Sequence, residues 1–504
     1  MKKARNNSSK KKKKNLSNPI AEFLGKPPCD FTRQDIVRYA YAKNLRLLTL
    51  SPLSGDGRMK TLTFPITSKA RLEEILDMGE RVDGSNHFPQ LNSTRSDIYI
   101  VPRYSTAFVN PFASIPTLVL MTACFGADER QFELCPYRLV MEAKNALAHE
   151  TNLSTRFLGE LEFYLIGPGE GTGQPGKTLY QESTPFVRFQ NVRDEIIDEL
   201  TSLGIGVKYA HAEVGGGSEG GKFCEQHEIE FTLKDPVEAA DQLVIGKWVV
   251  RNIAARYNLV ATFAPKIDTT LAGSGLHFHF QLLKDKDNIL FTKAGEVSAK
   301  GLHSIGGLLK HTPSLAAFGN TVPTSYLRLL SGMEAPDTAT WGEGNRSSLI
   351  RVPLGWRHRR PMAEVVNQKA GHRRNAHIDR KTIEFRLPDG SANVHLTIAG
   401  ILVALRSGLK DKGAIELAQM QRIENLQNRK TTSKTAVLPC SCSESADKLE
   451  DNRKVYEKLG VFPPALIDIL ISRLRSYNDK NLARSLRKNR KQLSKLITDS
   501  IHCG

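Results

Sequence analysis

Four short segments of this chain place two polar, ionisable residues one position apart, with an apolar residue between them. The segments are Glu160-Leu161-Glu162, Glu228-Ile229-Glu230, His277-Phe278-His279 and Glu384-Phe385-Arg386. Alternate side chains of a β-strand point to opposite faces, so each polar pair shares one face and the apolar residue points to the other. The pattern predicts one sheet with an apolar back and a polar front. Buried carboxylates and imidazoles are costly to gather unless cations and anionic ligands bind there.

The overall composition is typical of a globular protein, and much of the charge lies in one short segment. Of the 504 residues, 40% are hydrophobic and 25% are charged, and the formal net charge is +18. Residues 1–14 contain eight lysines and arginines and no acid. Aromatic residues make up only 7% of the chain and do not alternate with the basic clusters, so no stacking platform for nucleic acid is visible. We expect no nucleic-acid partner.

The search for targeting signals and the pattern of cysteines both bear on the expected cellular compartment. No apolar run approaches the roughly 18 residues of a membrane-spanning helix. The lysine-rich N-terminus lacks the continuous apolar segment of a secretory signal. The seven cysteines are an odd and scattered set, which argues against a disulfide framework. We therefore expect a cytoplasmic protein that does not enter a membrane.

Three regions follow from the hydrophobic pattern. Residues 1–21 are predicted to be a disordered basic tail. Residues 30–122 contain short strands and one helix, from Ser68 to Met78, which indicates a small α+β domain. Residues 123–504 contain longer helices alternating with strands and end in a helical region. Helices are predicted for 192–203, for 236–257 after the capping residue Asp235, and from Pro464 onward. The predicted fold class is α+β.

One segment matches a phosphate-binding loop. Gly171 to Thr178 satisfies the pattern G-x-x-x-x-G-K-[ST], and a predicted strand precedes it. The helix that should follow is interrupted at Pro185, and the residues between are poor helix formers. A long hairpin loop is the favoured interpretation, and the phosphate loop stays as a minor alternative.

The polar pairs belong to a longer series of motifs, and from Phe157 to about Ile401 this series resembles glutamine synthetase, type I. The motifs occur in the family's order: Phe157-Leu-Gly-Glu-Leu-Glu-Phe163, Ala212-Glu213-Val214, Gln226-His-Glu228-Ile-Glu-Phe231, Phe263-Ala-Pro-Lys266, Gly273-Ser-Gly-Leu-His277-Phe-His279, Gly332-Met-Glu-Ala-Pro336, Asn345-Arg-Ser347, Ile350-Arg-Val-Pro353, Ile383-Glu-Phe-Arg-Leu-Pro-Asp389 and Ala392-Asn393. The resemblance implies an N-terminal β-grasp domain, marked by Asp83-Gly-Ser85 and Ser105-Thr-Ala107. A large catalytic domain with an antiparallel sheet flanked by helices would follow.

The resemblance also implies a reaction and its cofactors. A carboxylate is a poor electrophile, so joining the γ-carboxylate of glutamate to ammonia requires an acyl phosphate made with ATP. Two Mg²⁺ ions, or Mn²⁺ ions, would clamp the phosphoryl group. By motif, one ion would be held by Glu160, His277 and Glu384, and the other by Glu162, Glu213 and Glu228.

The same resemblance assigns the cationic side chains to anions. His279, Arg346 and Arg351 are expected to contact ATP phosphates, with Arg346 also catalytic. Arg386 is expected to bind the reacting carboxylate and Arg328 the α-carboxylate. Planar guanidinium groups suit both kinds of anion.

The remaining expected site residues contact the glutamate substrate, the acyl phosphate or the ammonium. Gly273 is expected to contact the glutamate substrate. Glu334 resembles the glutamate of a mobile flap that covers the acyl phosphate and takes a proton from the attacking ammonium. Asp83 and Tyr180 would line the ammonium pocket. The family forms a dodecamer-type double ring in which Asp83 would complete the site of a neighbouring subunit.

Several positions depart from the family pattern and leave three hypotheses open. The departures are Ala272, Asn86, Thr382, Lys208 and a Gly-rich insertion from Gly215 to about Lys222. The first hypothesis is a ligase of glutamate with ammonia. The second is a γ-glutamyl ligase that uses another amine or acid, and the third is a non-catalytic relative. Glu230 shares the face of Glu228 but has no expected role.

Overall fold

The computed structural model describes residues 18–88, 96–169, 178–219, 221–330, 333, 335–336, 338–355, 366–367, 381–423, 438–480, 482 and 490–504. Most of the predicted basic tail, the phosphate-loop match from Gly171 to Lys177 and the flap residue Glu334 lie outside these ranges. Among the described residues, no helix is long and apolar enough to cross a membrane.

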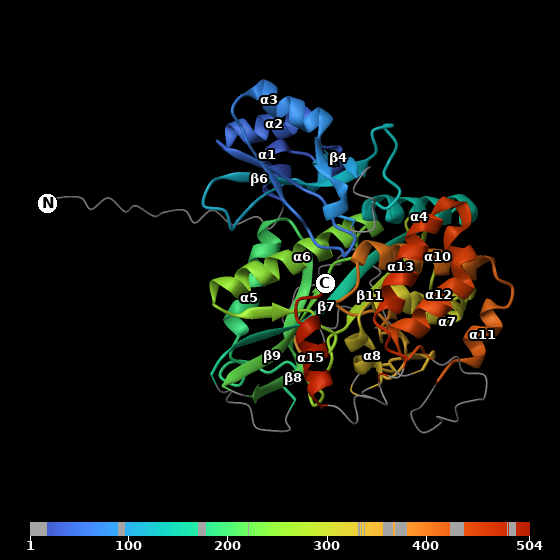
Figure 1. Ribbon diagram of the computed structural model, residues 1–504. Coiled ribbons are helices and arrows are strands. Elements are labelled where there is room, and N and C mark those ends of the chain that lie inside the picture. The colour runs from blue at the N-terminus through green and yellow to red at the C-terminus, as the bar shows by residue number, and fades with distance from the viewer. Residues whose placement is uncertain are drawn as a thin grey trace.

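The N-terminal unit, blue at the top of Figure 1, is a six-stranded sheet with helices packed beside it. The strands run in the order β2-β1-β6-β4-β3, and β5 also pairs with β6. β1 and β6 are parallel, whereas the other pairs are antiparallel. The elements are α1 (Pro19–Leu24), η1 (Pro28–Asp30), α2 (Arg33–Ala42), β1 (Leu47–Ser51), β2 (Leu62–Pro65), α3 (Lys69–Met78), β3 (Glu80–Asp83), η2 (Gly84–Asn86), β4 (Asp97–Pro102), η4 (Tyr104–Thr106), β5 (Phe108–Val109) and β6 (Thr117–Phe125).

Two boundaries differ from those expected from the sequence. Helix α1 begins at Pro19, inside the segment expected to be disordered up to residue 21. The Asn18 side chain caps this helix by accepting from the backbone N–H groups of Ile20 and Ala21, and Ile20 is buried in the core. Strand β6 continues to Phe125, beyond the expected boundary at residue 122, because its last residues still pair with β4.

The second unit contains a nine-stranded sheet in the order β13-β14-β15-β11-β7-β9-β8. Its strands are β7 (Ser154–Pro168), β8 (Val207–Glu219), β9 (Lys222–Phe231), β10 (Val260–Thr262), β11 (Leu276–Lys284), β12 (Asp287–Asn288), β13 (Trp341–Glu343), β14 (Ile350–Val352) and β15 (Ile383–Phe385). The four polar pairs lie on, or directly after, the adjacent strands β15, β11, β7 and β9. The prediction that they share one sheet is confirmed. The Gly-rich insertion lies in the hairpin formed by β8 and β9.

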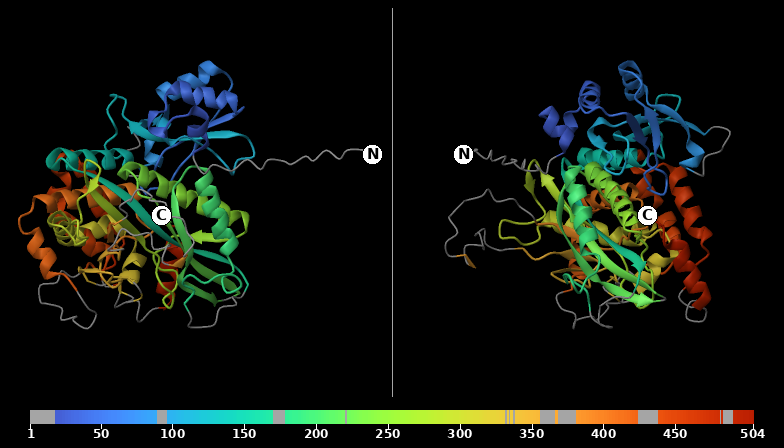
Figure 2. Two further views of the ribbon diagram at one scale, coloured as in Figure 1. Left: turned by 180° about the vertical axis from the view of Figure 1, so that it is seen from behind. Right: turned by 90° about the vertical axis from the view of Figure 1, so that its left-hand side faces the viewer.

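Helices surround this sheet (Figures 1 and 2). They are α4 (Pro136–Thr151), α5 (Gln190–Ser202), α6 (Pro236–Arg256), α7 (Ala299–Gly319), α8 (Pro323–Leu330), α10 (Val394–Lys410), α11 (Ala414–Met420), α12 (Cys442–Glu457), η6 (Lys458–Gly460), α13 (Pro464–Ser476) and α15 (Arg490–Ser500). Helix α6 covers the apolar back of the sheet, where a Cβ added at Gly159 would meet the Leu243 side chain at 2.7 Å. The apolar residues between the polar pairs are buried there: Leu161, Ile229, Phe278 and Phe385. The polar side chains therefore face the opposite side.

A buried ion pair joins the two units. Arg103, which follows β4, donates to Asp241 of α6 at 3.1 Å, and His395 of α10 lies 3.0 Å from the same carboxylate oxygen. A buried charge is tolerated only when it is paired, so these contacts hold the N-terminal unit against the second unit.

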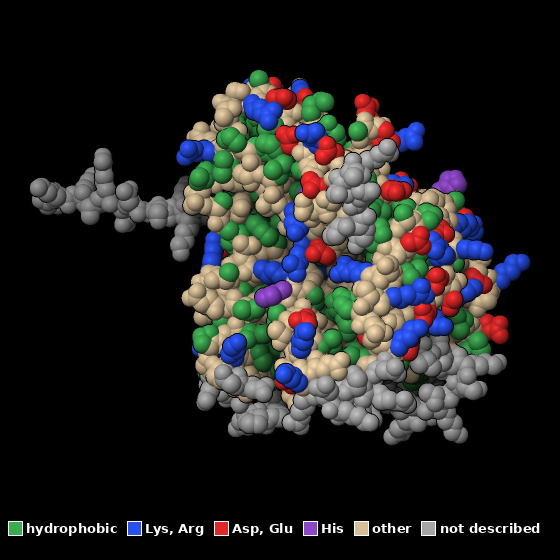
Figure 3. Space-filling model, viewed as in Figure 1, with side chains coloured by type: hydrophobic (Ala, Val, Ile, Leu, Met, Phe, Trp, Pro, Cys, Tyr) green, Lys and Arg blue, Asp and Glu red, His purple; other side chains and the backbone are tan. Residues whose placement is uncertain are grey.

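The charged side chains over α12 and α13 are mixed in sign (Figure 3). Arg475 contacts Asp447 at 2.7 Å and Glu450 at 2.5 Å, and Lys480 contacts Asp447 at 3.0 Å. Exposed pairs of this kind contribute little to stability. They keep this described face from being uniformly basic.

Candidate active site

The polar front of the nine-stranded sheet is the floor of a cavity of about 620 Å³. Acidic and basic side chains from six strands and the connecting loops line it. The lining residues are Glu160, Glu162, Tyr180, Lys208, Tyr209, His211, Glu213, Glu228, Glu230, His277, His279, Arg346, Arg351, Pro353, Leu354, Gly355, Lys381, Thr382, Glu384 and Arg386. Eleven of the fifteen residues expected to act in the site therefore line one cavity. The other four are Asp83, Gly273, Arg328 and Glu334, and Glu334 lies outside the described residues.

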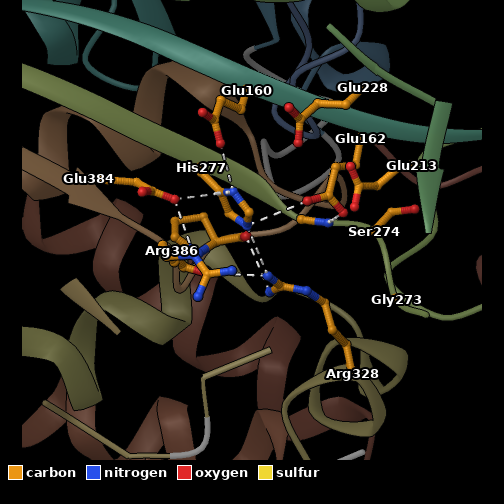
Figure 4. Close-up of polar contacts among 12 residues, drawn as sticks. Glu160, Glu162, Glu213, Glu228, Gly273, Ser274, His277, Arg328, Glu384 and Arg386 are labelled. Carbon is orange, nitrogen blue, oxygen red and sulfur yellow. Dashed lines mark hydrogen bonds and ion pairs between the residues drawn. The ribbon is translucent and has the colours of Figure 1, made fainter. Parts of the chain in front are cut away.

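The strand register explains how residues far apart in the chain meet. His277 of β11 lies opposite Glu160 of β7, and Glu160 lies opposite Glu230 of β9. One step along the same face, Glu162 lies opposite Glu228. Figure 4 shows the acidic side chains turned towards His277, with Arg328 approaching from the other side.

The first expected metal-binding set forms a compact group. Ligand atoms of Glu160, His277 and Glu384 all lie within 4.8 Å of one another. His277 Nδ1 is 3.0 Å from Glu160 Oε2 and 3.7 Å from Glu384 Oε1. All three side chains are buried, so they can hold an ion away from bulk water.

The second expected set is distributed over two overlapping groups. Glu162 and Glu228 form a group with His277, whereas Glu213 and Glu228 form one with His211. His211 Nε2 is 3.2 Å from Glu228 Oε1, and His211 Nδ1 is 3.5 Å from Glu213 Oε2. Glu228 therefore lies between the two groups.

The electrostatics of the floor fit divalent cations. Burial raises the pKa of Glu228 well above its usual range, and the neighbouring carboxylates of Glu160 and Glu162 raise it further. A cation among these groups removes that repulsion, and carboxylate oxygens with one imidazole suit hard divalent ions.

His279 and Glu160 form a charged pair beside this group. Burial lowers the pKa of His279, but the charge of Glu160 outweighs burial and raises it to about 9. Burial likewise opposes the charge of Glu160, yet His279 and His277 hold the pKa of its carboxyl well below the usual range. His279 Nδ1 lies 2.8 Å from the Thr382 hydroxyl, which orients the ring. The protonated ring is suited to contact an anion.

The arginines lie at one side of the cavity. Arg351 donates to Glu384 at 3.0 Å, and Arg386 Nε lies 3.1 Å from the same carboxylate. The Arg346 guanidinium is 5.9 Å from the centre of the Tyr180 ring. Tyr180 also packs edge-on against His211, with ring centroids 5.1 Å apart. Glu384 thus lies between two guanidinium groups, and Tyr180 lies between Arg346 and His211.

Arg328 and Gly273 line a separate small pocket of about 20 Å³ beneath His277. Arg328 is buried and donates to the backbone oxygens of Leu387 at 2.9 Å and Arg386 at 3.2 Å. The Gly273 carbonyl accepts from Gln226 at 3.1 Å. These two expected residues lie next to the larger cavity without lining it.

Asp83 does not approach the cavity of its own chain. It ends β3 in the N-terminal unit, and its carboxylate accepts from the Ser85 backbone at 2.9 Å and from the Asn86 amide at 2.7 Å. Glu334 lies outside the described residues.

Three features of the cavity were not expected from the sequence. His211 and Glu213 repeat the one-apart polar spacing on β8, and that spacing was the signal that could have identified His211. The bond between Thr382 and His279 has no sequence signal, because 103 positions separate them. Glu230 pairs with Lys208 at 2.6 Å.

Comparisons with known proteins identify the family of this chain. A family model described as the glutamine synthetase catalytic domain matches residues 133–476. Glutamine synthetase of Pyrococcus horikoshii is 30% identical over 422 residues, covering 83% of this chain and 87% of that protein. Glutamine synthetase of Staphylococcus aureus (strain Mu50) is 30% identical over 449 residues, covering 86% and 92%.

Solved structures share the fold. Plasmodium falciparum glutamine synthetase has a TM-score of 0.73 at 20% identity, over 89% of this chain and 96% of that one. A complex of a protein named GmaS with ADP has a TM-score of 0.71 at 22% identity, over 92% and 99%. The chain belongs to the glutamine synthetase family.

Proposed function

We propose that this chain is an ATP-dependent ligase that joins the γ-carboxylate of glutamate to ammonia through an acyl phosphate. The observation that carries this proposal is the cavity floor, where six candidate metal ligands from five strands lie beside three arginines. A binding protein without catalysis has no need for several buried carboxylates that repel one another.

Two divalent ions, magnesium or manganese, fit the floor. Glu160, His277 and Glu384 would hold one ion, and Glu162, Glu213 and Glu228 the other. When bound, the ions would neutralise phosphate charge at both ends of the phosphoryl transfer.

The chain's own residues would bind and orient the two anions. His279, Arg346 and Arg351 would hold the phosphates, since each offers a positive charge at the cavity wall. Arg386 would orient the reacting carboxylate beside them. Arg328, with the nearby Gly273, would meet the α-carboxylate and amino end of glutamate.

Three further residues would complete the catalytic site. Glu334 would cover the acyl phosphate and take a proton from the attacking ammonium, while Tyr180 and Asp83 would line the ammonium pocket. Because Asp83 is exposed and lies away from its own cavity, it would act in the site of a neighbouring subunit. We propose a homo-oligomer of the dodecamer-type double ring on this basis, and a cytoplasmic location stays a prediction.

The N-terminal unit would be a β-grasp domain. Its antiparallel β1–β2 hairpin, its helix α3 and the parallel pairing of β1 with β6 support this assignment.

A second candidate function is a γ-glutamyl ligase that uses another amine or acid. Asn86, at a departure from the family pattern, donates its amide to Asp83 at 2.7 Å and so changes the expected ammonium pocket. The carbonyl of Ala272, another departure, accepts from the Tyr164 hydroxyl at 2.7 Å.

A hydroxylamine trap tests the proposal. The purified protein is supplied with ATP, Mg²⁺, glutamate and hydroxylamine, and γ-glutamyl hydroxamate is measured. We expect hydroxamate that depends on both ATP and glutamate. ADP release with ammonia, methylamine, ethanolamine and polyamines then identifies the amine; activity with ammonia alone contradicts the second candidate. Failure with every acid and amine, despite bound nucleotide, contradicts both.

A further inference from the structure

An ion pair on the cavity wall joins two residues that the proposed reaction does not yet use. Lys208 of β8 lies 2.6 Å from Glu230 of β9, and both line the cavity. The Glu230 side chain is 1% exposed, whereas that of Lys208 is 43% exposed. The ammonium also lies 5.0 Å from the centre of the Tyr209 ring. One end of the pair is therefore fixed in the floor and the other is open to a ligand.

Through Glu230, the Lys208 ammonium is connected to the other charged groups of the cavity floor. Glu230 lies opposite Glu160 in the strand register, and Glu160 in turn contacts His279 at 2.9 Å. The buried carboxylate of Glu230 requires a positive partner, which Lys208 supplies. An ammonium has three donors, and among the described side chains Glu230 is its hydrogen-bond acceptor.

We propose that Lys208 is a ligand for the diphosphate of the bound nucleotide and that Glu230 positions it. This inference rests on the proposed use of ATP. Lys208 and His279 lie on strands separated by three strand spacings, about 14 Å in all. An extended nucleoside polyphosphate can reach across such a floor, whereas inorganic phosphate alone cannot contact both ends. A lysine ammonium is a compact charge that suits phosphate oxygens.

Nucleotide binding to two variants tests the role. Lys208→Met removes the cation, and the double variant Lys208→Met/Glu230→Gln removes both charges, so the net charge of the pair stays unchanged. Lys284→Met, at the exposed end of β11, is the matched control. Dissociation constants for ADP and adenosine are measured by displacement of a fluorescent ADP analogue, and melting temperatures confirm folding.

We expect both Lys208 variants to bind ADP about tenfold more weakly than the native protein, the effect of losing one charged hydrogen bond. Adenosine binding and the control should be unchanged. Native ADP affinity in the double variant would show that Lys208 only neutralises Glu230 and would overturn the proposal. The proposal would also be overturned if the Lys208 variants bound ADP and adenosine more weakly by the same factor, or if their affinity for ADP did not change. If the native protein does not bind ADP, the proposed function itself fails.

Discussion

Glu160 and His277 face each other across strands β7 and β11, with Glu160 Oε2 3.0 Å from His277 Nδ1, although 117 positions separate them in the chain. The sheet register produces this contact. Because Glu160 also contacts His279 through its other oxygen, one carboxylate joins the candidate metal site to the candidate phosphate contact. The following predictions concern the groups around this carboxylate.

Replacing Glu384 by alanine should abolish turnover. The carboxylate is a candidate metal ligand and also holds Arg351 and Arg386. Loss of a residue that only supports a metal ligand lowers activity by up to about a hundredfold. Because Glu384 is proposed to be a ligand itself, we expect ADP release to fall by at least that factor. Glu343→Ala, at the exposed end of β13, is the control and should retain activity. Full activity of Glu384→Ala would show that the metal assignment is wrong.

The pair of His279 and Glu160 should make the stability of the metal-free protein depend on alkaline pH. Since the folded pKa of His279 is raised from 6.5 to about 9, its stabilising contribution is complete below about pH 6.5 and is lost as the pH rises through about 9. Melting temperatures in EDTA should therefore fall less between pH 6.5 and 9.5 for His279→Gln than for the native protein. His149→Gln, exposed on α4, should behave like the native protein. Identical pH dependence in His279→Gln contradicts the charged pair.

Divalent cations should bind with release of protons. Because burial and the neighbouring carboxylates raise the pKa of Glu228, its carboxyl binds a proton more tightly than usual, and a cation competes with that proton. Adding Mg²⁺ or Mn²⁺ to metal-free protein in weak buffer should acidify the solution and raise the melting temperature. Glu228→Gln should reduce both effects, whereas Glu416→Gln on α11 should not. A rise in melting temperature without proton release contradicts this electrostatic interpretation.

Two inactive variants should complement each other if the site is shared between subunits. Asp83→Asn removes a residue of the N-terminal unit, and Glu384→Ala disables the cavity of the same chain. Mixed oligomers contain some sites with an intact Asp83 and an intact Glu384 from different subunits, so co-expression should restore part of the activity. Asp97→Asn, opposite Asp83 in the sheet, should stay active. No recovery in mixed oligomers would place Asp83 outside the neighbouring site.

Much of the cavity floor could be predicted because β-strand alternation is a local property. The spacing of Glu160 and Glu162, or of His277 and His279, is enough to place each pair on one face. The pairing of Lys208 with Glu230 could not be predicted in this way. A register shift between Val207 and Tyr209 changes which residues of β8 face the cavity, and register depends on contacts between strands.

The helices show a similar division between local and distant causes. Asp235 caps α6, as its sequence position predicts, because a cap is a contact between neighbouring residues. Ser68, where a helix was expected to begin, caps α3. The beginning of α1 depends in addition on the burial of Ile20 against the rest of the N-terminal unit, which composition alone does not reveal. Arg328 was likewise identified by its motif, while its bonds to the backbone of Arg386 and Leu387 depend on the folded loop.

Transfer of oxygen from glutamate to phosphate tests the central proposal most directly. The protein is supplied with ATP, Mg²⁺, ammonium and glutamate labelled with ¹⁸O in the γ-carboxylate, and the inorganic phosphate is examined by mass spectrometry. An acyl-phosphate mechanism predicts one ¹⁸O atom in each phosphate released together with glutamine. Unlabelled phosphate, or ADP release that does not require glutamate, would contradict it.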